Sequence, residues 1–133
     1  MRQFLLSILF ALAFTGPTQA EQDPIQNVIS DQIAAFLADD FETAFEYASP
    51  SIRSIFGTAR RFGEMVRNGY PMVYRPSEVT MLEQTREAGQ AEQRVMMRDA
   101  EGRLHLLAYG MIETANGWQI NGVRILRAPE LGV

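Results

Sequence analysis

Apolar residues recur at every third or fourth position from residue 23 to residue 69, which is the period of one face of an α-helix. A capping residue, in two places followed by proline, precedes each group of apolar positions. We therefore predict four consecutive helices, which begin at Asp23-Pro24, at Asp39 or Asp40, at Ser49-Pro50 and near Thr58. Their predicted inward positions include Ile25, Val28, Ile29, Gln32, Ile33, Phe36, Leu37, Phe41, Ala44, Phe45, Ala48, Ile52, Ile55, Phe56, Phe62, Met65 and Val66.

From Ser77 onward the period changes to two, as in strands that bury one face. Residues 99–102 and Asn116-Gly117 have the composition of hairpin turns. We predict four antiparallel strands, the last three at residues 93–98, 103–113 and 118–126, and Asn121-Gly122 predicts a β-bulge in the last of them. Residues 70–76 contain two prolines, so we expect an extended connector or a sheet edge there.

Helices followed by an antiparallel sheet predict an α+β fold, with N-terminal helices packed on a curved, cone-like, four-stranded antiparallel sheet. In the third strand we assign to the helix-covered face Leu104, Leu106, Ala108 and Ile112. The opposite face then carries His105, Leu107, Tyr109 and Met111. Because this second set is amphipathic, we expect another copy of the chain, forming a homodimer, or a ligand to cover part of it.

Residues 1–20 have the features of a secretory signal peptide. Arg2 precedes an apolar run at residues 4–14, and small residues at Thr18 and Ala20 mark a cleavage site. The run is shorter than the roughly 20 apolar residues of a membrane span. We predict cleavage after Ala20, a periplasmic or secreted location without a stable membrane anchor, and a single domain at residues 21–133. An uncleaved anchor is the alternative.

Composition and charge exclude several classes of function. The chain has no cysteine, which excludes disulfides, thiol catalysis and thiolate metal sites. Its formal net charge of −4 argues against a nucleic-acid surface, which would be basic. All its basic side chains are arginines, so no lysine is present for Schiff-base chemistry. Because the sequence has no strong catalytic, nucleotide or metal motif, we expect neither a cofactor nor a metal.

Short motifs also run through the chain, at Ala48-Ser49-Pro50-Ser51-Ile52, Phe56-Gly57, Phe62, Met65-Val66, Tyr70-Pro71, Val73-Tyr74-Arg75-Pro76, Gln93-Arg94-Val95, Asp99, Gly102, Tyr109 and residues 117–122. In these motifs nearly the whole of residues 21–133 resembles the proteobacterial family called domain of unknown function 4864. The chain departs from the family at His105, where tryptophan is expected, and at Val123, where cysteine is common. The resemblance implies a layout similar to the nuclear transport factor 2-like, or cystatin-like, superfold, whose curved sheet often encloses a pocket. It carries over no catalytic residue.

Few side chains are candidates for chemistry. His105 is the only histidine, and without a second ligand at a metal-binding spacing we favour a strand residue over a metal ligand or general base. Asp39-Asp40 has the form of a paired acid–base site, but helix capping is the simpler interpretation. Six methionines beyond the initiator predict either core filling or an adaptable apolar pocket.

Tyr74-Arg75 lies between two prolines, where a rigid segment would hold a guanidinium and a phenol ready to bind a carboxylate or phosphate. The alternative is that Tyr70 and Tyr74 pack the joint between helices and sheet, while Arg75 neutralises a cap or a nearby carboxylate. The candidate ligand-binding residues are Tyr47, Tyr70, Tyr74, Arg75, Tyr109 and Trp118.

Two classes of function remain. We favour a non-catalytic module that binds a small apolar or anionic ligand, or a protein, between helices and sheet. The alternative is a small acid–base enzyme of the isomerase, dehydratase or epoxide-hydrolase type. Such an enzyme needs a carboxylate or histidine with a raised pKa in its pocket, and the sequence shows no acid that clearly points inward.

Overall fold

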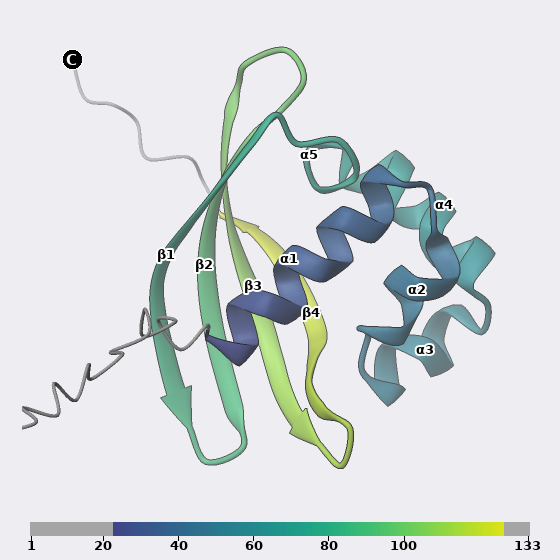
Figure 1. Cartoon of the computed structure of the whole chain (residues 1–133), viewed down its shortest axis with the longest axis vertical. Coiled ribbons are helices and arrows are strands. Elements are labelled where there is room, and N and C mark those ends of the chain that lie inside the picture. Colours follow the sequence, from purple (N-terminus) through teal and green to yellow (C-terminus); the bar gives the residue numbers. More distant parts are fainter. Residues whose placement is uncertain (1–22, 127–133) are drawn as a thin grey trace, which may run out of the picture.

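The computed structural model describes residues 23–126, which form five helices followed by four strands. Figure 1 shows the strands as one curved sheet, with α1 crossing one face of it and the next helices gathered beyond its β4 side. The strand order in the sheet is β1-β2-β3-β4, and all neighbouring strands are antiparallel. The predicted α+β class is therefore confirmed.

The four predicted helices form where their caps indicate. They are α1 (Pro24–Leu37), α2 (Phe41–Glu46), α3 (Pro50–Phe56) and α4 (Ala59–Gly69). Each begins after a side chain that accepts a hydrogen bond from a free backbone N–H of the first turn, and these caps are Asp23, Asp40, Ser49 and Thr58. Local capping thus sets the helix starts before any long-range contact is considered.

The segment between helices and sheet differs from the expected extended connector. Pro71–Tyr74 forms a short helix, α5, with proline at its first position. A proline restricts the residue before it, so the two prolines act on Tyr70 and Arg75, which both have non-helical backbone angles. The residues between them remain free to turn. The prediction was wrong because it extended the restriction across the whole segment.

The strands are β1 (Glu78–Glu87), β2 (Gln90–Arg98), β3 (Leu104–Thr114) and β4 (Gly117–Leu126). The two predicted hairpin turns connect β2 to β3 and β3 to β4. The bulge in β4 is confirmed, because Gly110 pairs with Gly122 while Met111 pairs with Ile120, which leaves Asn121 as the extra residue. This bulge bends β4 at the point where it borders the helices.

The helices cover the face of β3 opposite to the one predicted. Leu107, Tyr109 and Met111 are buried in the core that the helices share, whereas Leu104 is exposed. The reason lies in the neighbouring strand, since directly paired residues lie on the same face. Val95, the partner of Leu107, belongs to a buried and largely apolar row of β2, and the alternating positions of β2 are largely charged. The face that suggested a homodimer is covered by the chain's own helices, and the homodimer stays a prediction.

Aromatic side chains join the helices to one another. Phe62 of α4 lies within 5.4 to 5.8 Å, between ring centroids, of Phe36, Phe45 and Phe56. Two predicted inward residues, Leu37 at the end of α1 and Ile55 of α3, instead have 49% and 71% of their surface exposed. α3 is a helix of only two turns and has no buried residue, so only Ile52 and Phe56 reach toward the core.

The predicted signal peptide at residues 1–20 lies outside the described residues. Between residues 23 and 126, none of the helices combines the length and apolar character that crossing a membrane requires. The single domain predicted at residues 21–133 stays a prediction.

Candidate functional site

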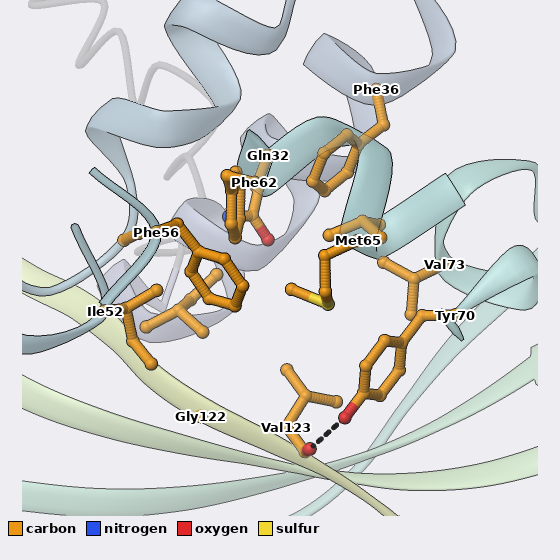
Figure 2. Close-up of a pocket in the computed structure, with 13 residues that line it drawn as sticks. Gln32, Phe36, Ile52, Phe56, Phe62, Met65, Tyr70, Val73, Gly122 and Val123 are labelled. Atoms are coloured by element: carbon orange, nitrogen blue, oxygen red, sulfur yellow. Dashed lines mark hydrogen bonds between the residues drawn. The ribbon is translucent and has the colours of Figure 1, made fainter. Parts of the chain in front are cut away.

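A pocket of about 240 Å³ opens between the helices and β4. Figure 2 shows its wall, with Phe56 and Ile52 of α3 on one side, Met65 of α4 and Tyr70 on the other, and Val123 of β4 below. The complete lining is Gln32, Phe36, Ala48, Ile52, Phe56, Phe62, Met65, Val66, Tyr70, Val73, Ile120, Gly122 and Val123. Side chains from α1, α3, α4, α5 and β4 thus converge on one hollow.

The local sequence explains why a hollow forms here. The bulge at Asn121 bends β4, and the Ser49 hydroxyl donates to the side-chain oxygen of Asn121 at 2.8 Å, which fixes the start of α3 against this bend. Residues 47–49 also run beside β4, where the backbone N–H of Ser49 donates to the carbonyl of Ile120. The wall next to this join contains Ala48 and Gly122, which are too small to fill it.

Two polar side chains lie in the otherwise apolar wall. Gln32 of α1 is only 3% exposed, and its Nε2 donates to the carbonyl of Ala44 at 3.1 Å. The Tyr70 hydroxyl donates to the carbonyl of Val123 at 3.2 Å, which is the dashed line in Figure 2. Both groups therefore hold two elements together and at the same time face the pocket.

Ionisable chemistry is sparse at the pocket. Tyr70 is the one ionisable group among its thirteen lining residues. Across residues 23–126, no group of three histidine or acidic side chains is arranged to hold a metal ion. The pocket wall is thus predominantly apolar, with Gln32 and Tyr70 as its two hydrogen-bonding side chains.

The predicted Tyr74-Arg75 pair lies outside the pocket wall and forms a cluster with Asp39. Arg75 Nη2 lies 2.8 Å from Asp39 Oδ1, Arg75 Nη1 donates to the carbonyl of Phe36 at 2.7 Å, and the Tyr74 hydroxyl also donates to Asp39. The guanidinium lies over the Tyr74 ring at 3.9 Å from its centroid. Hydrogen bonds from Tyr74 and then Arg75 hold the pKa of Asp39 below its ordinary value. We call Asp39, Tyr74 and Arg75 the Asp39 cluster.

Asp39 and Asp40, which the sequence offers as a pair, have separate tasks. Asp39 has a positive φ of 55° after the end of α1 and binds Arg75. Asp40 caps α2, where the Thr43 hydroxyl and backbone N–H hydrogen-bond to its carboxylate and lower its pKa. Neither carboxyl lines the pocket. Helix capping is therefore confirmed for Asp40, whereas Asp39 instead binds Tyr74 and Arg75.

His105 lies near the turn between β2 and β3, and its Nε2 is 2.8 Å from Asp99 Oδ2. Asp99 Oδ1 accepts the backbone N–H groups of Glu101 and Arg103. The hydrogen bond with His105, followed by these backbone bonds, holds the pKa of Asp99 below its ordinary value. This pair closes the hairpin, and His105 is a half-buried strand residue as expected.

The remaining candidates are scattered over the fold. Tyr109 is fully buried on the inner face of β3, and burial raises the pKa of its phenol. Tyr47 ends α2, and burial together with the charges of Asp31 and Glu46 raises its pKa. Trp118 lies under the Arg86 guanidinium at 5.6 Å. Of the six candidate ligand-binding residues, only Tyr70 lines the pocket.

Sequence reasoning missed Gln32 as a site residue. The sequence pattern predicts only that it lies on the inward face of α1. The available signal was that Gln32 is the one amide in an otherwise apolar stripe, and a buried polar group needs a partner. Its pocket partners Phe36, Ile52 and Phe62 look like ordinary core residues in the sequence, because nothing local distinguishes a core wall from a pocket wall.

Comparison with known proteins places the chain in a family and relates its fold to two solved structures. The fold is similar to that of RPA3114, a SEC-C motif containing protein from Rhodopseudomonas palustris, with a TM-score of 0.56 at 13% identity over 75% of this chain and 77% of that one. It is also similar to a Campylobacter jejuni protein described as an NTF2-like transpeptidase, with a TM-score of 0.51 at 11% identity over 73% of this chain and 97% of that one. At these identities the likeness concerns the fold alone.

No curated protein matches the sequence. The family described as domain of unknown function (DUF4864) matches residues 18–133, which include every described helix and strand. The resemblance that the motifs suggested is therefore confirmed, and the chain belongs to the family domain of unknown function (DUF4864).

Proposed function

We propose that the protein binds a small, uncharged, predominantly apolar molecule in the pocket between its helices and β4. The observation that carries the proposal is the composition of the wall, in which aromatic, aliphatic and methionine side chains from five elements surround one open volume. Specific small-molecule sites commonly combine such a wall with a few fixed polar groups. Gln32 and Tyr70 are those polar groups here.

The size of the pocket limits the ligand. An engineered cavity of about 150 Å³ lined by apolar side chains binds benzene. The pocket of this protein, at about 240 Å³, has room for a molecule somewhat larger than one benzene ring, such as a fused two-ring compound or a short branched chain. Met65 on its wall can change rotamer to fit different shapes.

The arrangement of charges supports an uncharged ligand over an anionic one. Arg75, the candidate anion anchor, uses both Nη atoms on Asp39 and on the carbonyl of Phe36. No arginine or histidine stands among the residues that line the pocket in the described chain. An anion would therefore lose its hydration there without a cation to replace it.

Acid–base catalysis receives no comparable support from the site. General acid–base chemistry needs a carboxylate or imidazole within reach of the substrate. The pocket wall of the described chain contains only the Tyr70 phenol as an ionisable group, and this hydroxyl already donates to Val123. We therefore propose binding without catalysis.

We further propose that the protein acts in the periplasm or outside the cell, after cleavage at Ala20. The support is the short apolar run at residues 4–14, which is followed by helix-breaking residues and a small-residue cleavage site. Mass spectrometry of the protein exported from its native host should give a chain that begins at Glu21. A purified chain that retains Met1 would contradict the proposal.

Methyl NMR tests the binding proposal with an internal control. Met65 lines the pocket, whereas Met97 is fully buried on the inner face of β2 and does not line it. In protein labelled with carbon-13 at the methionine methyl groups, indole should shift the Met65 signal with saturation and leave Met97 nearly unchanged. Benzoate, an anion of similar size, should shift neither signal. Saturable binding that leaves the Met65 signal unmoved would show that the site lies elsewhere.

A thermal-shift measurement complements the NMR titration. A ligand present at about 100 times its dissociation constant should stabilise the native state by about 2.7 kcal/mol. The Arg75→Ala variant should keep the shift given by indole, because Arg75 does not line the pocket. Loss of that shift in a folded Arg75→Ala variant would restore Arg75 as a ligand-binding residue.

A further inference from the structure

We propose that the ligand carries a hydrogen-bond donor, a hydroxyl or N–H group, on its apolar body, and that Gln32 Oε1 accepts this bond. The inference rests on the proposed function, because it concerns the ligand of the same pocket. It defines the chemical class more narrowly, as uncharged apolar molecules with a donor at one end.

The orientation of the Gln32 amide is fixed by its surroundings. Nε2 lies 3.1 Å from the carbonyl oxygen of Ala44, and a carbonyl can only accept, so the NH₂ group must be the end that faces it. The amide oxygen, Oε1, is consequently the end that points away from the Ala44 carbonyl. Gln32 is held in the second half of α1 and is 3% exposed, so this orientation does not depend on solvent.

The partners of the amide oxygen can be surveyed over the part of the chain that the structure describes. Among residues 23–126 no donor forms a hydrogen bond with Gln32 Oε1, although Nε2 is satisfied. Oε1 is also not fully enclosed by protein. Among residues 23–126, the side-chain polar atoms that are both fully enclosed and without a hydrogen-bond partner are Arg53 Nε and Tyr109 Oη, and Gln32 Oε1 is not one of them. Figure 2 shows the oxygen on the side of the amide that faces the open centre of the pocket. A ligand donor would supply the bond that the protein leaves open.

Tyr70 adds to the selection on the opposite side of the pocket, as Figure 2 shows. Its hydrogen is donated to the carbonyl of Val123, so toward the pocket the phenol oxygen can only accept. Both polar groups of the wall therefore present acceptors. A carboxylate has only acceptor atoms, so it could not form a hydrogen bond with the oxygens of Gln32 and Tyr70 that face the pocket. An alcohol, phenol or N–H heterocycle has a donor that is complementary to Gln32 Oε1.

Indole and benzofuran test the proposal on the unmodified protein. They have nearly the same shape, but indole has an N–H donor where benzofuran has a weakly accepting oxygen. We expect indole to bind at least about fivefold more tightly, which is the typical effect of one net hydrogen bond. Because benzofuran is the less polar compound, burial alone gives the reverse order. Equal affinities, or tighter binding of benzofuran, would overturn the proposal.

Two variants locate the effect. Gln32→Met keeps a side chain of similar length without the amide, and it should bind both compounds with the preference for indole removed. Arg75→Met, which changes a residue outside the pocket wall, is the control and should keep the preference. A Gln32→Met protein that still prefers indole by the same factor would refute the role of Gln32. If Gln32→Met does not fold because Ala44 loses its donor, the two-compound comparison on the unmodified protein decides by itself.

The Met65 methyl signal separates this inference from the proposed function. If neither compound moves the signal, binding in the pocket fails and the inference fails with it. If both compounds move it with equal affinity, binding in the pocket stands and only the donor requirement is wrong. Selective, Gln32-dependent binding of indole supports both.

Discussion

The pocket wall and the Asp39 cluster share one short stretch of the sequence, but they differ in how fully their polar groups are hydrogen-bonded. Tyr70 belongs to the pocket wall, and Tyr74 and Arg75, only one turn of α5 later, belong to the cluster. In the cluster, the guanidinium finds its acceptors within the protein, on Asp39 and on the last turn of α1. In the pocket, Gln32 Oε1 finds none among the described residues. A satisfied polar cluster stabilises a fold, whereas an unsatisfied polar atom beside an open apolar volume points to a ligand.

The substitution Met65→Trp should give the largest effect, because it places an indole group from the protein itself into the pocket. We expect binding of free indole to fall below detection while the unfolding free energy stays the same or rises. Met65→Leu, which nearly conserves volume, is the control and should remain folded at a cost below about 1.5 kcal/mol, with binding retained. Calorimetric titration measures indole binding to each variant, and urea unfolding measures its stability. Full indole affinity in Met65→Trp would place the binding site elsewhere.

Arg75→Met should separate stability from binding. The variant loses the hydrogen bonds to Phe36 and Asp39, which should lower the unfolding free energy by about 1 to 2 kcal/mol at this partly exposed position. The indole affinity should not change. Arg60→Met, which removes an exposed ion pair with Glu64, is the control and should cost less than about 0.5 kcal/mol. Urea unfolding gives these values, and the opposite pattern, lost affinity at unchanged stability, would make the Asp39 cluster the binding site.

Tyr70→Phe should have a smaller effect on stability, about 0.5 to 1.5 kcal/mol, because it removes one neutral hydrogen bond to the Val123 carbonyl. The pocket keeps its shape, so benzofuran should bind at least as well as before. Unfolding and titration of the same preparation check both statements. A large loss of benzofuran affinity would mean that the hydrogen bond from the Tyr70 hydroxyl to the Val123 carbonyl is needed to shape the pocket wall.

The smallest expected effect is a pH dependence at the Asp39 cluster. Asp39 has a folded-state pKa below its ordinary value of 3.8, so its contribution to stability is complete above the unfolded pKa and is lost as the pH falls through the folded pKa. The stability difference between the wild type and Asp39→Asn should therefore shrink as the pH falls from about 5 to below 3.8. Thermal unfolding at several pH values measures it. A difference that grows on acidification would show that the carboxylate is not stabilised in the folded protein.

Local chemistry allowed much of the fold to be predicted. The four caps, the turns at residues 99–102 and 116–117, and the bulge at Asn121 are encoded within a few residues of where they act. The buried face of β3 was misassigned because Leu106 and Leu107 are both apolar, and only the charged positions of the paired strand β2 reveal which face is inner.

The pocket was beyond the same kind of reasoning. Its wall combines α1, α3, α4, α5 and β4, and the hollow depends on how these elements pack and not on any local motif. Tyr70 was identified because a phenol at the joint between helices and sheet stands out in the sequence. Gln32 was placed correctly on the inner face of α1, but its free oxygen becomes visible only when Ala44 is seen to fix its amide.

A crystal structure of the protein grown with indole would show directly whether the pocket between the helices and β4 binds this ligand. We expect the ring to lie between Phe62, Met65 and Val123, with its nitrogen within hydrogen-bond distance of Gln32 Oε1. Indole bound at the Asp39 cluster or on the outer face of the sheet, with the pocket filled only by ordered water, would contradict it.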